Sequence, residues 1–231
     1  MAFALVVSTS GDASGDPANT ALTPAEDFTG VNLIVVAGTG IFGEPTLTDT
    51  EANSYTGLTL QDNGGFYFLR IYYCVNPVVS ASMQFQYAGV SLFPALCVQG
   101  WSGADTSPFD QQNGVNTGTI TGGGAGVQTG SVTPTTNDQL VIAALRYSAT
   151  ITSPVIDLGF TVDGNEPPIG GQNDGCAMAY LVQTTATAVN PEWSDPTNNS
   201  GNICAAIATF KAAGGGGGAT YPGYVGKGGW F

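Results

Sequence analysis

The sequence contains no histidine and only four basic residues, Arg70, Arg146, Lys211 and Lys227. Without histidine, Ser-His-Asp and Cys-His catalytic arrangements are excluded, and the commonest general base is absent. The two lysines lie at a predicted strand end and in the C-terminal segment, where nothing in the sequence would activate an amine as a nucleophile. We therefore expect that the protein is not an enzyme.

Positive charge is also too scarce for anionic partners. The 17 acidic residues give a formal net charge of −13. Nucleic-acid binding needs clustered lysine and arginine to displace counterions from phosphates, and anionic membrane surfaces attract basic segments. We expect neither a nucleic-acid partner nor a membrane partner. The acidity is interpreted as favouring solubility, with a specific cationic partner as the alternative.

Long apolar runs are missing as well. No stretch approaches the roughly 18 apolar residues of a membrane-spanning helix. The first residues lack the basic region of a signal peptide and have only a short apolar run, so we predict a first β-strand there. This combination favours a protein made in a host cytoplasm and later exposed on a virion surface.

Common metal-site patterns are absent too. The four cysteines are Cys74, Cys97, Cys176 and Cys204. None belongs to a Cys-x-x-Cys motif, and without histidine no common zinc site is predicted. Each cysteine lies in or beside an apolar run, which favours buried free thiols, with one or two disulfides as the alternative. Residues 163–174 carry oxygen ligands of the type that Ca²⁺ prefers, but not in EF-hand spacing. We expect no metal and no cofactor.

Charged residues make up only 9% of the chain, whereas hydrophobic residues make up 42% and glycine contributes 34 residues. This profile suits strands joined by tight turns, because threonine and valine favour a pleated surface and glycine shapes turns. We predict an all-β fold, an antiparallel two-sheet β-sandwich of jelly-roll-like type, over residues 1–212. The predicted strands are 31–38, 46–49, 55–60, 65–75, 83–89, 94–101, 139–147, 177–184 and 203–212.

Three segments depart from this pattern. Residues 102–131 are long and polar, and we predict a functional loop, a contact arm or a flexible span there. Residues 163–175 are predicted to form a second long loop. Residues 213–231 form a glycine-rich tail, flexible by composition, in which terminal aromatic residues are typical of anchors. The predicted assembly contacts in this tail are Tyr221, Tyr224, Trp230 and Phe231.

Two stretches resemble each other. Leu22–Asp27 and Val132–Asp138 each contain a Thr-Pro turn with an acidic residue, and each precedes an almost continuous apolar run. Such runs fit strands that are buried on both faces. The similarity indicates equivalent positions in two sheets, or chance, and it is too short to establish a repeat.

The run Leu47–Thr56 resembles the "tDs-x-G-N-x-Y-t" turn of β-sandwich domains in bacterial surface proteins and phage virion proteins. The resemblance continues at Tyr72–Pro77, Gly100–Gly103 and Ala208–Ala212, and it covers most of residues 25–212. It implies a jelly-roll-like or immunoglobulin-like sandwich used for display, adhesion or assembly, with no catalytic residues to transfer. Ala52 stands where the family has glycine, so the turn departs from the family pattern there.

Candidate ligand sites are few. Trp101 and Trp193, with Tyr180, could stack on a sugar ring, although a sandwich core also uses aromatic residues. Gly38–Gly43 matches Gly-x-Gly-x-x-Gly, but no helix pattern follows, so we interpret it as a glycine-rich turn. Paired carboxylates, such as those beside Trp193, lie in predicted turns, where aspartate commonly caps its own backbone.

These features favour a non-enzymatic virion structural protein of a bacteriophage. It would serve as a capsid decoration, head-fibre or tail-associated component that assembles with other copies of itself and with neighbouring virion proteins. A surface rich in threonine, asparagine and glycine packs against itself without burying many charges. One alternative is a glycan-binding adhesin or receptor-recognition module with a host-surface glycan as partner. A weaker alternative is a subunit of a bacterial extracellular filament.

Overall fold

The computed structural model describes residues 2–13, 19–89, 91–120, 126–148, 150–168, 174–196 and 201–214. In this part of the chain the regular structure consists of antiparallel β-strands, which confirms the predicted all-β class. No helix among these residues is long and apolar enough to cross a membrane.

The first half of the chain forms a main sheet and a cover sheet. Its strands are β1 (Ala4–Asp12), β2 (Thr20–Leu22), β3 (Leu33–Ile41), β4 (Thr46–Asp49), β5 (Thr56–Gly57), β6 (Gln61–Asp62), β7 (Tyr67–Val75), β8 (Phe85–Ala88) and β9 (Leu92–Ser102). The main sheet has the order β1-β9-β3-β7, with β5 and β6 on the outer edge of β7. The cover sheet has the order β2-β8-β4, and it is continuous with the main sheet where β2 pairs with the end of β1.

The second half repeats this arrangement. Its strands are β10 (Ala104–Ile120), β11 (Val127–Gln128), β12 (Gln139–Tyr147), β13 (Val155–Ile156), β14 (Thr161–Glu166), β15 (Gly175–Gln183), β16 (Glu192–Ser194) and β17 (Gly201–Ala212). The main sheet has the order β10-β17-β12-β15-β14, and the separate cover sheet has the order β11-β16-β13.

Both halves are rolled-up antiparallel ribbons. In the first half β1 pairs with β9, β2 with β8 and β3 with β7; in the second half β10 pairs with β17, β11 with β16 and β12 with β15. Rolling such a ribbon brings its last strand against its third, as β9 meets β3 and β17 meets β12. This is the winding of a jelly roll. The all-β class is confirmed, and because this winding occurs twice, the one two-sheet sandwich that was predicted for residues 1–212 is instead two jelly-roll units.

The equivalence of the halves extends to single hydrogen bonds. The Thr23 N–H donates to the Phe85 carbonyl at 3.0 Å, and the Thr129 N–H donates to the Pro191 carbonyl at 3.0 Å. Thr129 follows Thr23 in the chain by the same number of residues as Pro191 follows Phe85. An isolated β-bridge lies nearby in each half, between Glu26 and Met83 in the first and between Val132 and Val189 in the second. The two bridges are separated along the chain by the same number of residues as the two hydrogen bonds. The similar stretches in the sequence therefore lie beside equivalent strands, although their Thr-Pro pairs are not equivalent.

The middle strands β3 and β12 are buried along their whole length. Leu33 on β3 lies opposite Trp101 of β9, and Leu140 on β12 lies opposite Phe210 of β17. Because both faces of these strands are covered, their sequences are nearly continuous apolar runs rather than alternating ones.

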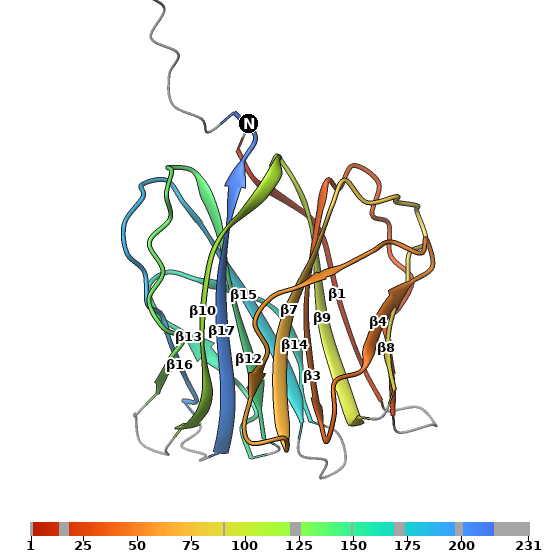
Figure 1. Ribbon diagram of the computed structural model, residues 1–231, viewed down its shortest axis with the longest axis vertical. Helices are drawn as coiled ribbons and strands as arrows, with labels where there is room; N and C mark the ends of the chain where they lie inside the picture. The colour runs from red at the N-terminus through yellow and green to blue at the C-terminus, as the bar shows by residue number, and fades with distance from the viewer. Residues whose placement is uncertain are drawn as a thin grey trace, which may run out of the picture.

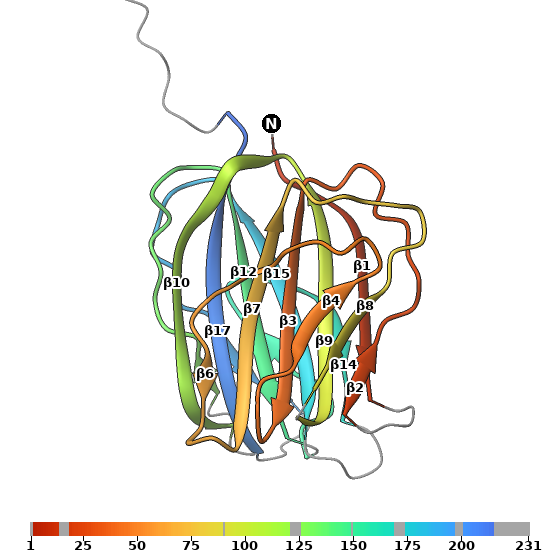
Figure 2. The same cartoon turned by 45° about the vertical axis from the view of Figure 1, so that its right-hand side comes forward.

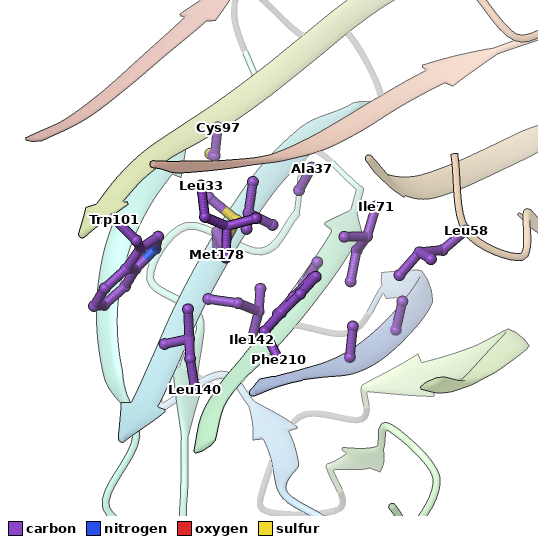
Figure 3. Packing of buried hydrophobic residues seen from close by; sticks show 14 of the residues in the cluster. Leu33, Ala37, Leu58, Ile71, Cys97, Trp101, Leu140, Ile142, Met178 and Phe210 are labelled. Atoms are coloured by element: carbon purple, nitrogen blue, oxygen red, sulfur yellow. The ribbon is translucent and has the colours of Figure 1, made fainter. Parts of the chain in front are cut away.

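The sheets stack in layers, with the main sheets facing each other and the cover sheets outside (Figure 1). A central cluster fills the space between the main sheets, and Leu33 and Leu140 point into it (Figure 3). Outward residues of the main sheets meet the cover sheets: Ile34 clusters with Tyr87, and Val141 clusters with Trp193. Figure 2 shows β4 and β8 lying over the outer face of the first main sheet.

Two predicted loops are strands instead. β10 occupies much of the predicted loop 102–131, and β14 occupies the start of the predicted loop 163–175. Both are edge strands of the second main sheet. Edge strands carry polar residues because one side of the strand meets water, so their composition resembles that of a loop. The prediction was wrong for this reason.

Candidate functional site

Trp101 and Tyr180 lie together in the structure, as part of the central cluster. Their rings meet edge-on with centroids 4.9 Å apart, and Phe3 packs on the other side of Trp101 at 6.3 Å. Trp101 is only 1% exposed. A sugar ring has no access to this indole without movement of the surrounding side chains.

Trp193 lies far from this pair in the fold, in the core between the second main sheet and its cover sheet, and it is 0% exposed. The three aromatic residues therefore do not form one platform, and both indoles pack as core residues do. The other predicted contacts, Tyr221, Tyr224, Trp230 and Phe231, lie outside the described residues.

The Gly-x-Gly-x-x-Gly match serves packing. A Cβ at Gly38 would lie 2.7 Å from the Tyr87 ring, and one at Gly40 would lie 2.2 Å from the Ser91 Oγ. Both glycines belong to β3, where the backbone passes close under the cover sheet. The match arises from this close approach, so the predicted glycine-rich turn was wrong for Gly38 and Gly40, which are strand residues.

Three of the candidate calcium ligands, Asp163, Asn165 and Glu166, accept hydrogen bonds from the protein. Ser8 Oγ donates to Asp163 at 3.0 Å, Ser10 Oγ donates to Glu166 at 2.7 Å, and the Tyr147 hydroxyl donates to Asn165 at 2.5 Å. The described ranges contain no group of three or more cysteine, aspartate or glutamate residues that could hold a metal ion.

Asp12 and Glu166 bring two carboxylates together where β1 meets β14. Burial raises the pKa of Glu166, the Asp12 carboxylate raises it further, and the hydrogen bond from Ser10 acts in the opposite direction. Protonation of Glu166 relieves the repulsion between the two groups.

Arg146 lies fully buried at one end of the central cluster. Its Nε donates to Asp174 Oδ1, its Nη1 donates to the Asn202 carbonyl at 3.1 Å, and its guanidinium carbon lies 3.7 Å from the centre of the Tyr67 ring. Both partners of the ion pair are 0% exposed. Because neither charge reaches solvent, we interpret this buried ion pair as a structural contact.

All four cysteines are buried free thiols. Burial raises the pKa of Cys204 to about 12 and that of Cys176 well above its ordinary value. Because the thiolate is the reactive form, these two sulfurs are poor nucleophiles at neutral pH.

The turn that carries the family resemblance is a hydrogen-bonded structural unit. Asp49 Oδ1 accepts the N–H groups of Glu51 at 2.9 Å and Asn53 at 3.1 Å, and Asp49 Oδ2 accepts the Tyr55 hydroxyl at 2.5 Å. Ala52, at the position where the family has glycine, adopts φ +57°. The aspartate, asparagine and tyrosine of the motif therefore hold a turn, and they form no catalytic group.

A groove opens between the two main sheets at one side of the sandwich. It has a volume of about 520 Å³, and its walls are Ser54, Thr56 and residues 73–75 and 106–109. The rings of Tyr73 and Phe109 lie nearly parallel there, with centroids 5.9 Å apart and planes at 14°. The lining carries hydroxyl groups and no charged side chain. The chemistry of this groove fits a neutral ligand.

An apolar patch lies at the end of the first main sheet. Phe42, Phe66 and Leu92 are 53%, 56% and 43% exposed. They lie at the same end of this sheet, because Ile41, the neighbour of Phe42, pairs with Tyr67, the neighbour of Phe66, and with Leu92. The rings of Phe42 and Phe66 are 5.1 Å apart, and Phe42 holds φ +64°, a strained conformation for a residue other than glycine. No sequence motif marks this patch, so it was not predicted.

Comparisons with protein-family models, with curated proteins and with solved structures find no match to this chain.

Proposed function

We propose that this protein is a non-enzymatic structural component of a bacteriophage virion, exposed on the particle surface as a capsid decoration, head-fibre or tail-associated part. It acts by assembling with copies of itself and with neighbouring virion proteins. Jelly rolls are common in viral capsid proteins and also in lectins, so the fold favours this class by analogy.

The apolar patch of Phe42, Phe66 and Leu92 carries the proposal. Exposed aromatic side chains that contact each other mark protein contact sites more often than scattered surface residues do. Aromatic residues are also enriched in protein interfaces. A neighbouring subunit that covers this patch would remove both rings from water.

The tail supplies a second proposed contact. Residues 213–231 combine a glycine arm with Tyr221, Tyr224, Trp230 and Phe231, and we expect these side chains to dock on an adjacent subunit. Their docking site is left open.

Two variants, one substituted in the patch and one truncated, test the proposal in a particle-incorporation assay. Phe42→Ser with Phe66→Ser, and separately a chain that lacks residues 213–231, should each reduce incorporation at least tenfold while circular dichroism and urea unfolding stay close to wild type. Val78→Ser is the matched control, because Val78 is 62% exposed and lies outside the patch. Normal incorporation of both test proteins would contradict the assembly mechanism.

A glycan-binding function is the second candidate, and the neutral groove favours it. Part of its wall, Thr106–Phe109, belongs to the long polar segment 102–131. Glycan-array binding that is lost in Phe109→Ala and kept in Trp193→Ala would assign the sugar to the groove. The reverse pattern would assign it to Trp193, and no binding by the wild type would remove this candidate.

A further inference from the structure

The two jelly rolls contact each other reciprocally. β15 contacts β3 and β9, while its counterpart β7 contacts β12 and β17, which are the counterparts of β3 and β9. At the two sides of the sandwich, β1 contacts β14 and β10 contacts β6. A set of contacts that is unchanged when the partners are exchanged is characteristic of a two-fold, self-complementary interface. The surface between the main sheets therefore has the form of a homodimer interface within one chain.

Each half also has a core of its own. Ile34 clusters with Phe85 and Tyr87 beneath the first cover sheet, and Val141 clusters with Trp193 beneath the second. Neither core contains a residue of the other half. The halves are therefore joined through the central cluster and could keep their inner packing if they separated.

The face that separation would uncover is apolar. Leu33 and Ile71 on one side, and Leu140 and Ile142 on the other, lie in the central cluster and are at most 1% exposed. Exposing such a face to water is unfavourable in proportion to its area. Each face therefore needs a matching partner, and the opposite half of any copy of this chain supplies one.

A single residue, Gly103, connects the two halves, since β9 ends at Ser102 and β10 begins at Ala104. Gly103 holds φ +90°, and a Cβ at this position would lie 2.3 Å from the Ala2 carbonyl oxygen. Glycine adopts this conformation freely, but a one-residue connection leaves no slack, so the closed monomer requires it, and a different conformation of Gly103 directs the two halves to different partners. Short hinges favour exchange between subunits.

We propose that two copies of this chain exchange halves about Gly103, so that the first main sheet of each copy packs on the second main sheet of the other. The exchanged dimer keeps the contacts of the central cluster and differs from the monomer at the hinge. This inference does not depend on the virion assignment, since it concerns the interface between the halves alone.

Full-chain Gly103→Val tests the hinge. Valine cannot adopt the hinge conformation without strain of about 1–2 kcal/mol, and each 1.4 kcal/mol is tenfold in an equilibrium constant. After refolding, size-exclusion chromatography with light scattering should show a dimerisation constant at least tenfold above that of wild type. Gly30→Val is the matched control, because Gly30 has φ +89°, lies within the first half and has open space around its Cβ position. It should leave the mass unchanged.

Two native cysteines report the exchange itself. The Cys97 thiol of β9 lies 3.4 Å from the carbonyl oxygen of Cys176 on β15, so the two residues meet across the interface. Cys97→Ser and Cys176→Ser chains, each also carrying Cys74→Ser and Cys204→Ser so that one cysteine is left per chain, are refolded together with oxidised glutathione, which joins the two remaining sulfurs and releases two molecules of reduced glutathione. Only exchanged copies bring Cys97 of one chain beside Cys176 of the other. A disulfide-linked dimer between the two variants is the expected result.

The same cross-linking mixture is prepared with the wild-type hinge, so a failure of Gly103→Val to fold leaves the test decisive. A linked dimer that forms in the mixture, and is absent when either variant is refolded alone, supports the exchange. The proposal is overturned if Gly103→Val folds and stays monomeric. It is also overturned if the mixture gives no linked dimer while the wild-type monomer forms the disulfide internally.

Discussion

Trp101 and Tyr180 meet edge-on across the two main sheets, with ring centroids 4.9 Å apart and planes at 75°. Tyr73 and Phe210 repeat this contact in the opposite sense, at 5.6 Å and 66°. In each case a tyrosine of one half meets an aromatic ring on the last strand of the other half. The two contacts are related by an approximate two-fold axis between the main sheets.

Double-mutant cycles should show that these contacts are energetically equivalent. Leucine substitutions of Trp101 and Tyr180, alone and together, are compared with those of Phe210 and Tyr73 by urea unfolding. Each cycle should give a coupling of about 0.5–1.5 kcal/mol, the usual range for buried aromatic pairs. A coupling near zero in one cycle alone would contradict the equivalence of the two contacts.

Ala52→Gly should stabilise the protein. Ala52 holds φ +57°, a conformation that glycine adopts without steric strain and alanine does not. We expect the free energy of unfolding to rise by about 1 kcal/mol. Ala25→Gly is the control: Ala25 is exposed and lies outside the positive-φ positions, so glycine there should lower stability slightly.

Arg146→Met should cost about 3–5 kcal/mol of stability, because it leaves the Asp174 carboxylate buried without its cationic partner. Adding Asp174→Leu removes the remaining charge. The double variant should therefore unfold at a higher urea concentration than Arg146→Met alone. If the second substitution lowers stability further, the charge pair is not the source of the loss.

Glu166 should make the protein more stable as the pH falls from neutral towards the ordinary glutamate pKa. Because the folded-state pKa of Glu166 is raised, the folded protein binds a proton more readily than the unfolded chain, and stability declines as the pH rises through that folded pKa. Glu166→Gln should reduce this dependence and stabilise the protein at neutral pH. Thermal unfolding of both proteins across this pH range measures the difference, and parallel pH profiles would contradict the assignment.

Local sequence patterns were enough to predict the central strands. The apolar runs at 139–147 and 203–212 predict β12 and much of β17, because a strand that is buried on both faces consists almost entirely of apolar residues. The run at 65–75 likewise predicts β7. Edge strands such as β10 were not predicted, because their polar residues are also typical of loops.

What the sequence determined by itself is the all-β class and the absence of histidine-based catalysis, because both depend on residue types alone. Only the tertiary structure decided that the jelly roll occurs twice. The two halves share backbone hydrogen bonds, such as those of Thr23 and Thr129, although their side chains differ. The fold also decided that Trp101 and Trp193 pack as core residues in separate layers. The fold alone placed Phe42, Phe66 and Leu92 at the same end of the first main sheet, because β3, β7 and β9 are far apart in the chain and pair with one another there.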